Sequence, residues 1–516
     1  MKRRLWIVAA VLAVLSGVAI FLAIPRNDYI LPALRYRIPK IDHYPLFGRA
    51  VVAAGDPQPW PYAPGVADAR VPDSAEAAFA ALETTAYLVV KDGQIVLEQY
   101  WDGYADTLWS NSFSMAKSVV SLLVGCAIDD GYIRSVDQPV ADFLPGGWTW
   151  RPEAGSRQRA VAEASASVGA GSCVGSSVET LVGSDEDDAD AVVASVGAGS
   201  PVGSPVETLV GSDEMNATID TAAVPLRIRD LLTMSAGFRW NESSASLFSP
   251  TTQIYYGGDL EAILNRVRFK ERPGLYFEYQ SGVTQLLAMV LTRAVGRPLA
   301  DYASEKLWRP LGAEEDAIWS TDGKGVEKAF CCFNSNARDF ARIGQLILQH
   351  GRWNGVPLVD SAYLRAAVTP ADYLLTHDGT GEPLPRRNGF GAGISDPGSR
   401  PASVGSENRP EPAAAEPAEL ATGLAESVGA AESAPRGLAD QNHCTYYGYQ
   451  MWIAELRGHT MPYCRGILGQ YIIVIPDENM VVVRLGRARS DARDPRQAYT
   501  RDLELWVNTA LDLFGE

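Results

Sequence analysis

The chain has 516 residues, of which 47% are hydrophobic and 9% aromatic, so it can bury one large core or two modest ones. Its formal net charge of −17 argues against a nucleic-acid partner, because nucleic acid requires a basic protein surface. The five histidines are scattered without the spacing of metal ligands, and we expect no metal and no other cofactor.

The amino-terminal segment has the pattern of a membrane anchor. Residues 5–24 are an almost unbroken apolar run that follows the basic residues Lys2–Arg4. About 20 apolar residues span a bilayer, and basic residues at one end stay in the cytoplasm. We therefore predict a signal anchor at residues 1–24, which crosses the inner membrane once and leaves the rest of the chain in the periplasm. The alternative is a secreted protein with a cleaved signal peptide, since Gly17–Ala19 offers small residues at a cleavage spacing.

The next segment, residues 25–84, is rich in proline and aromatic residues, and we expect it to be an extended strap. A folded domain is then predicted at residues 85–515. Its first feature is residues 87–100, where two runs of strand-forming residues flank the pair Asp92-Gly93. An Asp-Gly pair between two such runs is the strongest short signal for a hairpin, so a sheet begins here.

A serine and a lysine lie three residues apart at the start of the next predicted helix, as Ser114 and Lys117. On a helix these positions share one face, about 5–6 Å apart at Cβ, so the amine can reach the hydroxyl. The residues that follow, 118–127, are mostly apolar, which predicts a buried helix. Burial favours the neutral amine, which can accept the serine proton. The tetrad alone is a weak signal, because an exposed lysine near a helix start is its ordinary explanation.

Two low-complexity inserts interrupt the domain, at about residues 155–215 and 396–440. Within the first insert, residues 166–186 recur almost unchanged as residues 194–214. Such a sequence has no aromatic residues and little bulk, so it cannot offset the entropy of ordering. We expect a disordered loop there.

The rest of the domain alternates helical and strand patterns. We expect a sheet that takes strands from both ends of the chain, with helices between them. The predicted helices are residues 282–295, 337–350 and 497–514, and the predicted strands are residues 446–453, 469–476 and 480–485.

The six cysteines of an exported chain can pair in several combinations, among which the sequence does not choose. Adjacent Cys331 and Cys332 are not expected to pair with each other. Cys444 and Cys464 are plausible partners for one or both of them. Cys126 lies on the predicted buried helix and is expected to be a core residue.

Four separated motifs occur in an order that resembles one family. Together they resemble the penicillin-recognising serine hydrolases, in the branch of class C β-lactamases, serine esterases and 6-aminohexanoate-oligomer hydrolases. The resemblance covers residues 85–515 apart from the inserts. The motifs are Ser114-Met115-Ala116-Lys117, Leu231-Leu232-Thr233-Met234-Ser235-Ala236-Gly237, Phe277-Glu278-Tyr279-Gln280-Ser281-Gly282 and Gly466-Ile467-Leu468-Gly469-Gln470-Tyr471.

This resemblance implies an α/β (α+β) fold, in which an antiparallel sheet is flanked by helices and an all-α subdomain carries the Ser-x-x-Lys helix. It also implies that Tyr279 is catalytic, and we expect a nearby lysine ammonium to lower the pKa of this phenol. The backbone of Ser114 and the strand near Gly466 and Ile467 would supply the amides of an oxyanion hole.

Two departures from the family pattern bear on the substrate. Where the family has Tyr-x-Asn, with an amide that contacts the lysine and the substrate, this sequence has the shorter hydroxyl of Ser281, which we expect at the substrate. The Lys-Thr-Gly or His-Thr-Gly of β-lactamases has no clean match here. Met461-Pro462-Tyr463 falls near that place, and Arg465 follows closely. Pro462 also removes a backbone donor from an expected strand edge. The departures favour an esterase or linear-amide hydrolase over a β-lactamase.

The predicted function is therefore hydrolysis of a small ester or amide through an acyl-enzyme, with Ser114, Lys117 and Tyr279 as catalytic residues. One alternative is a non-catalytic scaffold or cell-wall binding protein of the same fold. A second is a β-lactamase or D-Ala-D-Ala peptidase. An α/β-hydrolase triad is a weaker enzyme hypothesis, because the sequence has no Gly-x-Ser-x-Gly motif. The oligomeric state is left open.

Overall fold

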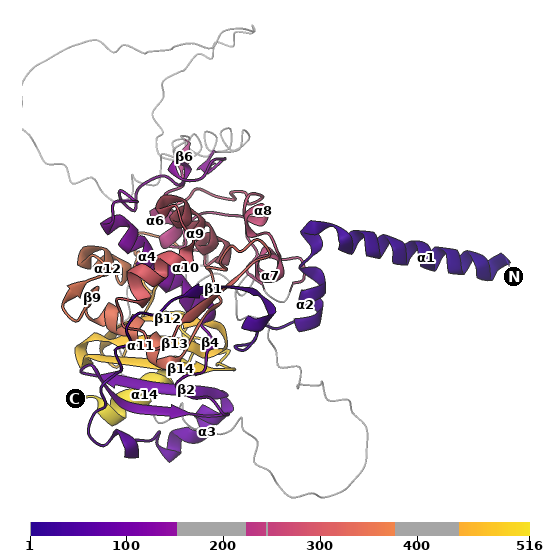
Figure 1. Cartoon of the computed structure of the whole chain (residues 1–516). Coiled ribbons are helices and arrows are strands. Elements are labelled where there is room, and N and C mark those ends of the chain that lie inside the picture. Colours follow the sequence, from indigo (N-terminus) through magenta and orange to yellow (C-terminus); the bar gives the residue numbers. More distant parts are fainter. Residues whose placement is uncertain (1, 152–222, 244–245, 377–442) are drawn as a thin grey trace, which may run out of the picture. The chain divides into compact units, whose positions relative to one another are not determined.

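The computed structural model describes residues 2–151, 223–243, 246–376 and 443–516 (Figure 1). The predicted inserts at about residues 155–215 and 396–440, and Cys173, lie outside the described residues. The chain divides into one compact unit of Met1–Trp150 with Pro225–Glu516 and a second of Arg151–Val224. The sheets, helices and site below belong to the first unit.

A six-stranded antiparallel sheet is the centre of this unit. Its order is β11-β12-β13-β14-β2-β3, so the first hairpin pairs with the carboxy-terminal strands (purple beside yellow in Figure 1). In the β2–β3 turn Asp92 and Gly93 both have positive φ, which a two-residue hairpin requires. The prediction of a sheet with strands from both ends of the chain is confirmed. The strands are β2 (Thr84–Lys91), β3 (Gln94–Tyr100), β11 (Trp452–Leu456), β12 (His459–Gly466), β13 (Gln470–Ile475) and β14 (Met480–Gly486).

Two helices cover opposite faces of this sheet. They are α11 (Ala337–Leu348) and α14 (Asp502–Phe514). Val481 of β14 lies against Gly344 of α11, where a Cβ would clash with it. Arg484, three residues further along β14, lies over the Trp506 ring of α14 at 4.6 Å. Successive side chains of a strand alternate between faces, so the two helices bury both sides of the sheet.

The Ser-x-x-Lys motif lies in a helical part of the same unit. There α4 packs against α9 and α12, and all residues from Ala116 to Ala127 are buried, as the apolar run predicted. The predicted combination of helices with an antiparallel sheet is confirmed. The helices of this part are α4 (Ala116–Asp129), α6 (Ile228–Leu232), α7 (Pro250–Tyr256), α8 (Leu260–Leu264), α9 (Ser281–Val295), α10 (Leu299–Ala303) and α12 (Ser361–Ala367).

Residues 25–84 are not the extended strap that their composition predicted. They include two helices and the strand β1, which pairs with β7 in a second sheet of order β1-β7-β8-β4. The prediction is wrong because apolar side chains here find partners far along the chain. Phe79, for example, packs on Tyr87 and Trp506, with ring centroids 5.0 and 4.7 Å away. The elements within residues 25–84 are α2 (Ile30–Tyr36), β1 (Gly48–Val52) and α3 (Asp73–Ala81). The other strands of the second sheet are β4 (Ser110–Asn111), β7 (Ala317–Thr321) and β8 (Phe333–Ser335).

Two predicted boundaries differ from the structure. The strand predicted from residue 446 begins at Trp452, because Gln450 before it has a φ of 58° and donates a side-chain hydrogen bond to the Leu231 carbonyl at 2.7 Å. The closing helix begins at Asp502 rather than at residue 497.

Short elements complete the unit: η1 (Pro25–Asn27), η2 (Tyr44–Leu46), η3 (Val66–Asp68), η4 (Phe113–Met115), η5 (Val140–Asp142), η7 (Ser304–Trp308), η9 (Ile467–Gly469), η10 (Pro476–Glu478), β9 (Arg352–Trp353) and β10 (Val356–Pro357). At the margins of the first gap lie β5 (Thr149–Trp150) and β6 (Val224–Pro225).

The first helix, α1 (Lys2–Ala23), is the one helix in the described part of the chain that is long and apolar enough to cross a membrane. Its apolar stretch, Arg4–Ala23, has 20 residues, and none of that stretch is buried against the rest of the protein. Length and composition fit a signal anchor and a signal peptide equally.

Candidate active site

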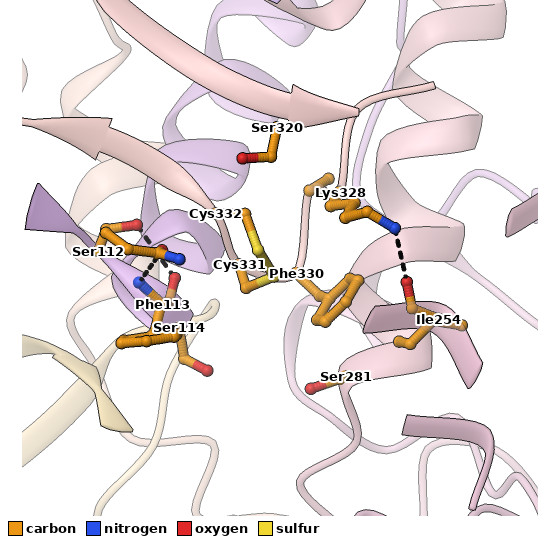
Figure 2. Close-up of a disulfide and its surroundings, with 12 residues drawn as sticks. Ser112, Phe113, Ser114, Ile254, Ser281, Ser320, Lys328, Phe330, Cys331 and Cys332 are labelled. Atoms are coloured by element: carbon orange, nitrogen blue, oxygen red, sulfur yellow. Dashed lines mark hydrogen bonds between the residues drawn. A yellow bond between two sulfur atoms is a disulfide. The ribbon is translucent and has the colours of Figure 1, made fainter. Parts of the chain in front are cut away.

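Ser114 lies in a strained turn between β4 and α4. The preceding residue, Phe113, has a φ of 44°, a left-handed conformation that costs about 1–3 kcal/mol for a residue with a side chain. Two hydrogen bonds hold it. The Phe113 N–H donates to Asn111 Oδ1 and the Ser112 N–H donates to the Phe333 carbonyl of β8, both at 2.9 Å. The turn, drawn in Figure 2, places Ser114 at the start of α4 with 8% of its surface exposed.

The Lys117 amine reaches three acceptors in the core. It donates to Ser114 Oγ at 2.9 Å, to Ser281 Oγ at 3.3 Å and to the Phe330 carbonyl at 2.8 Å. The residue is 1% exposed, and burial holds the pKa of Lys117 well below its usual value because the ammonium loses its hydration. Attraction to Glu242 opposes this shift without cancelling it. The geometry therefore joins a serine hydroxyl to an amine that loses its proton readily.

Tyr279 lies immediately before α9 and faces the same pair. Its ring centroid is 5.0 Å from Lys117 Nζ, and its hydroxyl shares a hydrogen bond with Ser114. Our expectation of a lowered phenol pKa is wrong. Burial raises the pKa of Tyr279 well above its usual value, and the hydrogen bond and nearby arginines only reduce that shift. The phenol therefore keeps its proton at neutral pH.

The end of β12 lies against the Ser114 turn. A Cβ added to Gly466 would lie 2.2 Å from the Ser112 carbonyl oxygen, so only glycine allows this approach. The next residue, Ile467, packs with Phe113 in a small apolar cluster. Gly466 pairs with Gln470 of β13, beyond the last residue of β12 that pairs with β11. The backbone near Gly466 and Ile467 is therefore adjacent to Ser114.

The segment Met461-Pro462-Tyr463 lies within β12, but not at the edge of the sheet. Pro462 pairs with Ile453 of β11, so the expectation of a strand edge at Pro462 is wrong. The sequence did not show that an additional strand pairs along this side. Met461 and Tyr463 are buried, and the Arg465 guanidinium lies 3.6 Å over the ring of Trp452, which in turn neighbours Tyr279.

Two groups next to Lys117 and Ser281 were not predicted from the sequence. One is the Phe330 carbonyl, a backbone atom that no side-chain motif can reveal. The other is Glu242, which is fully buried and accepts hydrogen bonds from Ser281. Its only signal is an acidic residue that follows Trp240, shortly after the motif that ends at Gly237.

A disulfide joins the adjacent residues Cys331 and Cys332, beside the Ser112–Ser114 turn (Figure 2). The expectation that they would not pair with each other is wrong. Cys332 has a left-handed φ of 65°, and the Cys331 N–H donates to the Lys328 carbonyl at 3.1 Å, so the fold holds the turn that such a bridge needs. The other suggested partners, Cys444 and Cys464, are free and buried, and burial raises the pKa of each thiol to about 12. Cys126 is also free and buried.

Comparison with known proteins places these residues in a family. The β-lactamase family model matches residues 204–505, which is more than half of the chain. The chain belongs to the β-lactamase family. This β-lactamase-family match includes Tyr279, Ser281, Gly466 and Ile467, and it begins after α4. The resemblance to penicillin-recognising serine hydrolases is confirmed, and the family is one of hydrolases.

Two individual proteins are similar to this chain. The chain is 24% identical over 285 residues to 6-aminohexanoate-dimer hydrolase of Paenarthrobacter ureafaciens, a match that covers 55% of this chain and 57% of that protein's length. A solved structure from Bacillus anthracis, described as a 6-aminohexanoate-dimer hydrolase, has a TM-score of 0.55 at 17% identity and covers 93% of this chain and 94% of its own. At that identity the structure confirms the fold alone.

Proposed function

We propose that this β-lactamase-family member is a serine hydrolase that cleaves small esters or linear amides through an acyl-enzyme on Ser114. One observation carries the proposal: Nζ of the buried Lys117 and Ser114 Oγ share a hydrogen bond of 2.9 Å, while burial lowers the pKa of the amine. A neutral amine in that position accepts a proton at the pH where an ordinary lysine carries one.

The proton path uses three groups. Lys117 accepts the Ser114 proton as Oγ bonds to the substrate carbonyl carbon and the carbonyl electrons move to its oxygen. Tyr279, protonated because of its burial, donates its proton to the leaving group, and the Lys117 ammonium returns a proton to the phenolate. Water then attacks the acyl carbon as Lys117 accepts one of its protons, and Lys117 gives that proton to Ser114 Oγ as the acid leaves.

Backbone amides would stabilise the oxyanion of each step. The Ser114 N–H and the backbone at Ile467 are the proposed donors, since Gly466 brings the end of β12 against the Ser112 carbonyl. Donors of this kind are worth about 10²–10³ in rate when they are fixed before the reaction.

Two features support an ester or a linear amide as the substrate. The relative from Paenarthrobacter ureafaciens is a 6-aminohexanoate-dimer hydrolase, and two amino-acid units of this kind are joined by an amide bond. Met461 and Tyr463 are buried in β12, near the place where the resemblance puts the Lys-Thr-Gly of β-lactamases. A β-lactamase or D-Ala-D-Ala peptidase remains the second candidate because Arg465 lies near Tyr279, and a non-catalytic scaffold is the third.

Replacement of Ser114 or Lys117 tests the mechanism. We expect Ser114→Ala to abolish covalent labelling by a fluorophosphonate and to lower kcat/KM for p-nitrophenyl butyrate at least about 10³-fold, because the nucleophile is lost. Lys117→Met keeps the apolar stem without the amine and should lose nearly as much. Intact-protein mass after labelling and initial ester rates are the measurements.

Ser118→Ala is the matched control, since Ser118 is buried one turn along α4 and donates to the Gln450 carbonyl at 2.7 Å. It should be labelled like the natural protein. Labelling that persists in Ser114→Ala would place the nucleophile elsewhere. A natural protein that is folded but never labelled would favour the scaffold.

The substrate class has its own test. We expect kcat/KM for a chromogenic cephalosporin to be at least about tenfold below that for a short-chain p-nitrophenyl ester, about 1.4 kcal/mol in transition-state binding. The reason is that β12 offers no lysine or threonine at Met461-Pro462-Tyr463 to orient a β-lactam carboxylate. Cephalosporin turnover equal to ester turnover would show that another group makes that contact.

For location, we propose that α1 anchors the protein in the inner membrane, with the folded domain in the periplasm. The full chain should then sediment with membranes at high salt, and protease added outside spheroplasts should digest the domain. A soluble product that begins near Ile20 would instead indicate a cleaved signal peptide.

A further inference from the structure

Glu242 is a buried carboxylate with an unusually full set of donors. Its residue is 0% exposed. Oε2 accepts from Trp240 Nε1 at 2.9 Å, from Thr251 Oγ1 at 3.1 Å and from the Ser281 N–H at 2.8 Å, while Oε1 accepts from Ser281 Oγ. Four donors that converge on one carboxyl group favour its charged form and hold it in one orientation.

Ser281 links this carboxylate to the lysine. Its hydroxyl accepts a hydrogen bond from Lys117 Nζ at 3.3 Å and donates its own proton to Glu242. The packing around the link is tight, because a Cβ on Gly282 would lie 2.5 Å from the Trp240 ring. Trp240 therefore rests on the start of α9 and keeps Glu242 opposite Ser281.

The charges around Lys117 identify Glu242 as its main electrostatic partner. Within the described residues Glu242 is the charged group that shifts the pKa of Lys117, and it shifts that pKa upward. Burial raises the pKa of the Glu242 carboxyl, and Lys117 acts in the opposite direction. The other titratable group that faces the amine is Tyr279, which itself lies in the field of Arg465 and Arg489.

We propose that Glu242 is a positioning residue that acts on Lys117 through Ser281. Its carboxylate stabilises the ammonium that forms when Lys117 takes the Ser114 proton, and the Ser281 bridge holds the amine against Ser114. In this step the Ser114 O–H bond breaks and a Lys117 N–H bond forms, while Ser281 keeps its proton and Glu242 neither gains nor loses one. The inference rests on the proposed function, because it requires Lys117 to be the base.

The substitution Glu242→Gln tests the inference through pH dependence. Without the carboxylate the ammonium is less favourable, so the acidic limb of kcat/KM against pH should move to lower pH by at least about one unit. The plateau should fall about 10–100-fold, because the ammonium formed in the transition state has lost its counter-charge. Glu242→Asp retains the charge and should return the limb toward its natural position. The substrate is p-nitrophenyl butyrate.

The control is Glu327→Gln, which alters another buried carboxylate, one that accepts a hydrogen bond from the Ala300 N–H at 3.0 Å. Its acidic limb should match the natural protein. A Glu242→Gln profile that is lower but has an unshifted limb would overturn the inference, since a merely structural role scales activity at every pH.

Fluorophosphonate labelling separates this inference from the proposed function. If Ser114 is labelled in the natural protein and the Glu242→Gln limb does not move, the inference fails and the proposed function stands. If Ser114 is never labelled, both fail. Where Glu242→Gln does not melt cooperatively, Ser281→Ala replaces it. That variant should lower the plateau about tenfold and shift the limb in the same direction, and an unchanged profile would contradict the inference.

Discussion

Burial of the Lys117 amine is the constraint on which the site depends. The residue lies on a helix whose first three turns are wholly buried, so its amine has protein acceptors in place of water. Removing an ammonium from water costs several kcal/mol unless its surroundings compensate. Three neutral oxygen atoms that contact the amine, and the Glu242 carboxylate that is linked to it through Ser281, offset part of this cost. The result is an amine of lowered pKa in contact with a serine hydroxyl, which is the requirement for a general base at neutral pH.

Segments from distant parts of the chain pack around this amine, and glycines allow two of them to approach closely. β8 receives the hydrogen bond of Ser112 and follows the turn that carries the Phe330 carbonyl. α9 begins at Ser281, with Gly282 beneath Trp240. β12 ends at Gly466 against the Ser112 carbonyl. The same packing that buries the lysine therefore brings together the phenol, the strand end and the carboxylate.

The sequence predicts a contact where the residues are close in the chain, or where motifs occur in the same order as in a known family. The Asp92-Gly93 hairpin and the pairing of Ser114 with Lys117 depend on residues within one turn of each other. Tyr279 and Gly466 were found because their order along the chain resembles a family. Glu242 was missed, since its contacts exist only after α9 packs on the loop that carries it.

The wrong expectations have physical causes of the same kind. The phenol pKa of Tyr279 was expected to fall because a sequence shows neighbouring charges and not the depth of burial, which dominates. In the disulfide of Cys331 and Cys332, Cys332 has a left-handed φ. A sequence without glycine at that place does not predict such a backbone conformation. The proline content of residues 25–84 predicts a strap, because a sequence does not show that Phe79 packs on Trp506 of α14.

If burial makes Lys117 a base, the pKa of its amine is low, and titration of this side chain by NMR measures that pKa. Protein with lysine isotope-labelled at Cε, compared with Lys117→Met to assign the signal, gives the pKa of this one amine. We expect the Lys117 amine to titrate at least about two units below the lysine reference of about 10.4. A Lys117 signal that titrates together with the surface lysines would contradict it.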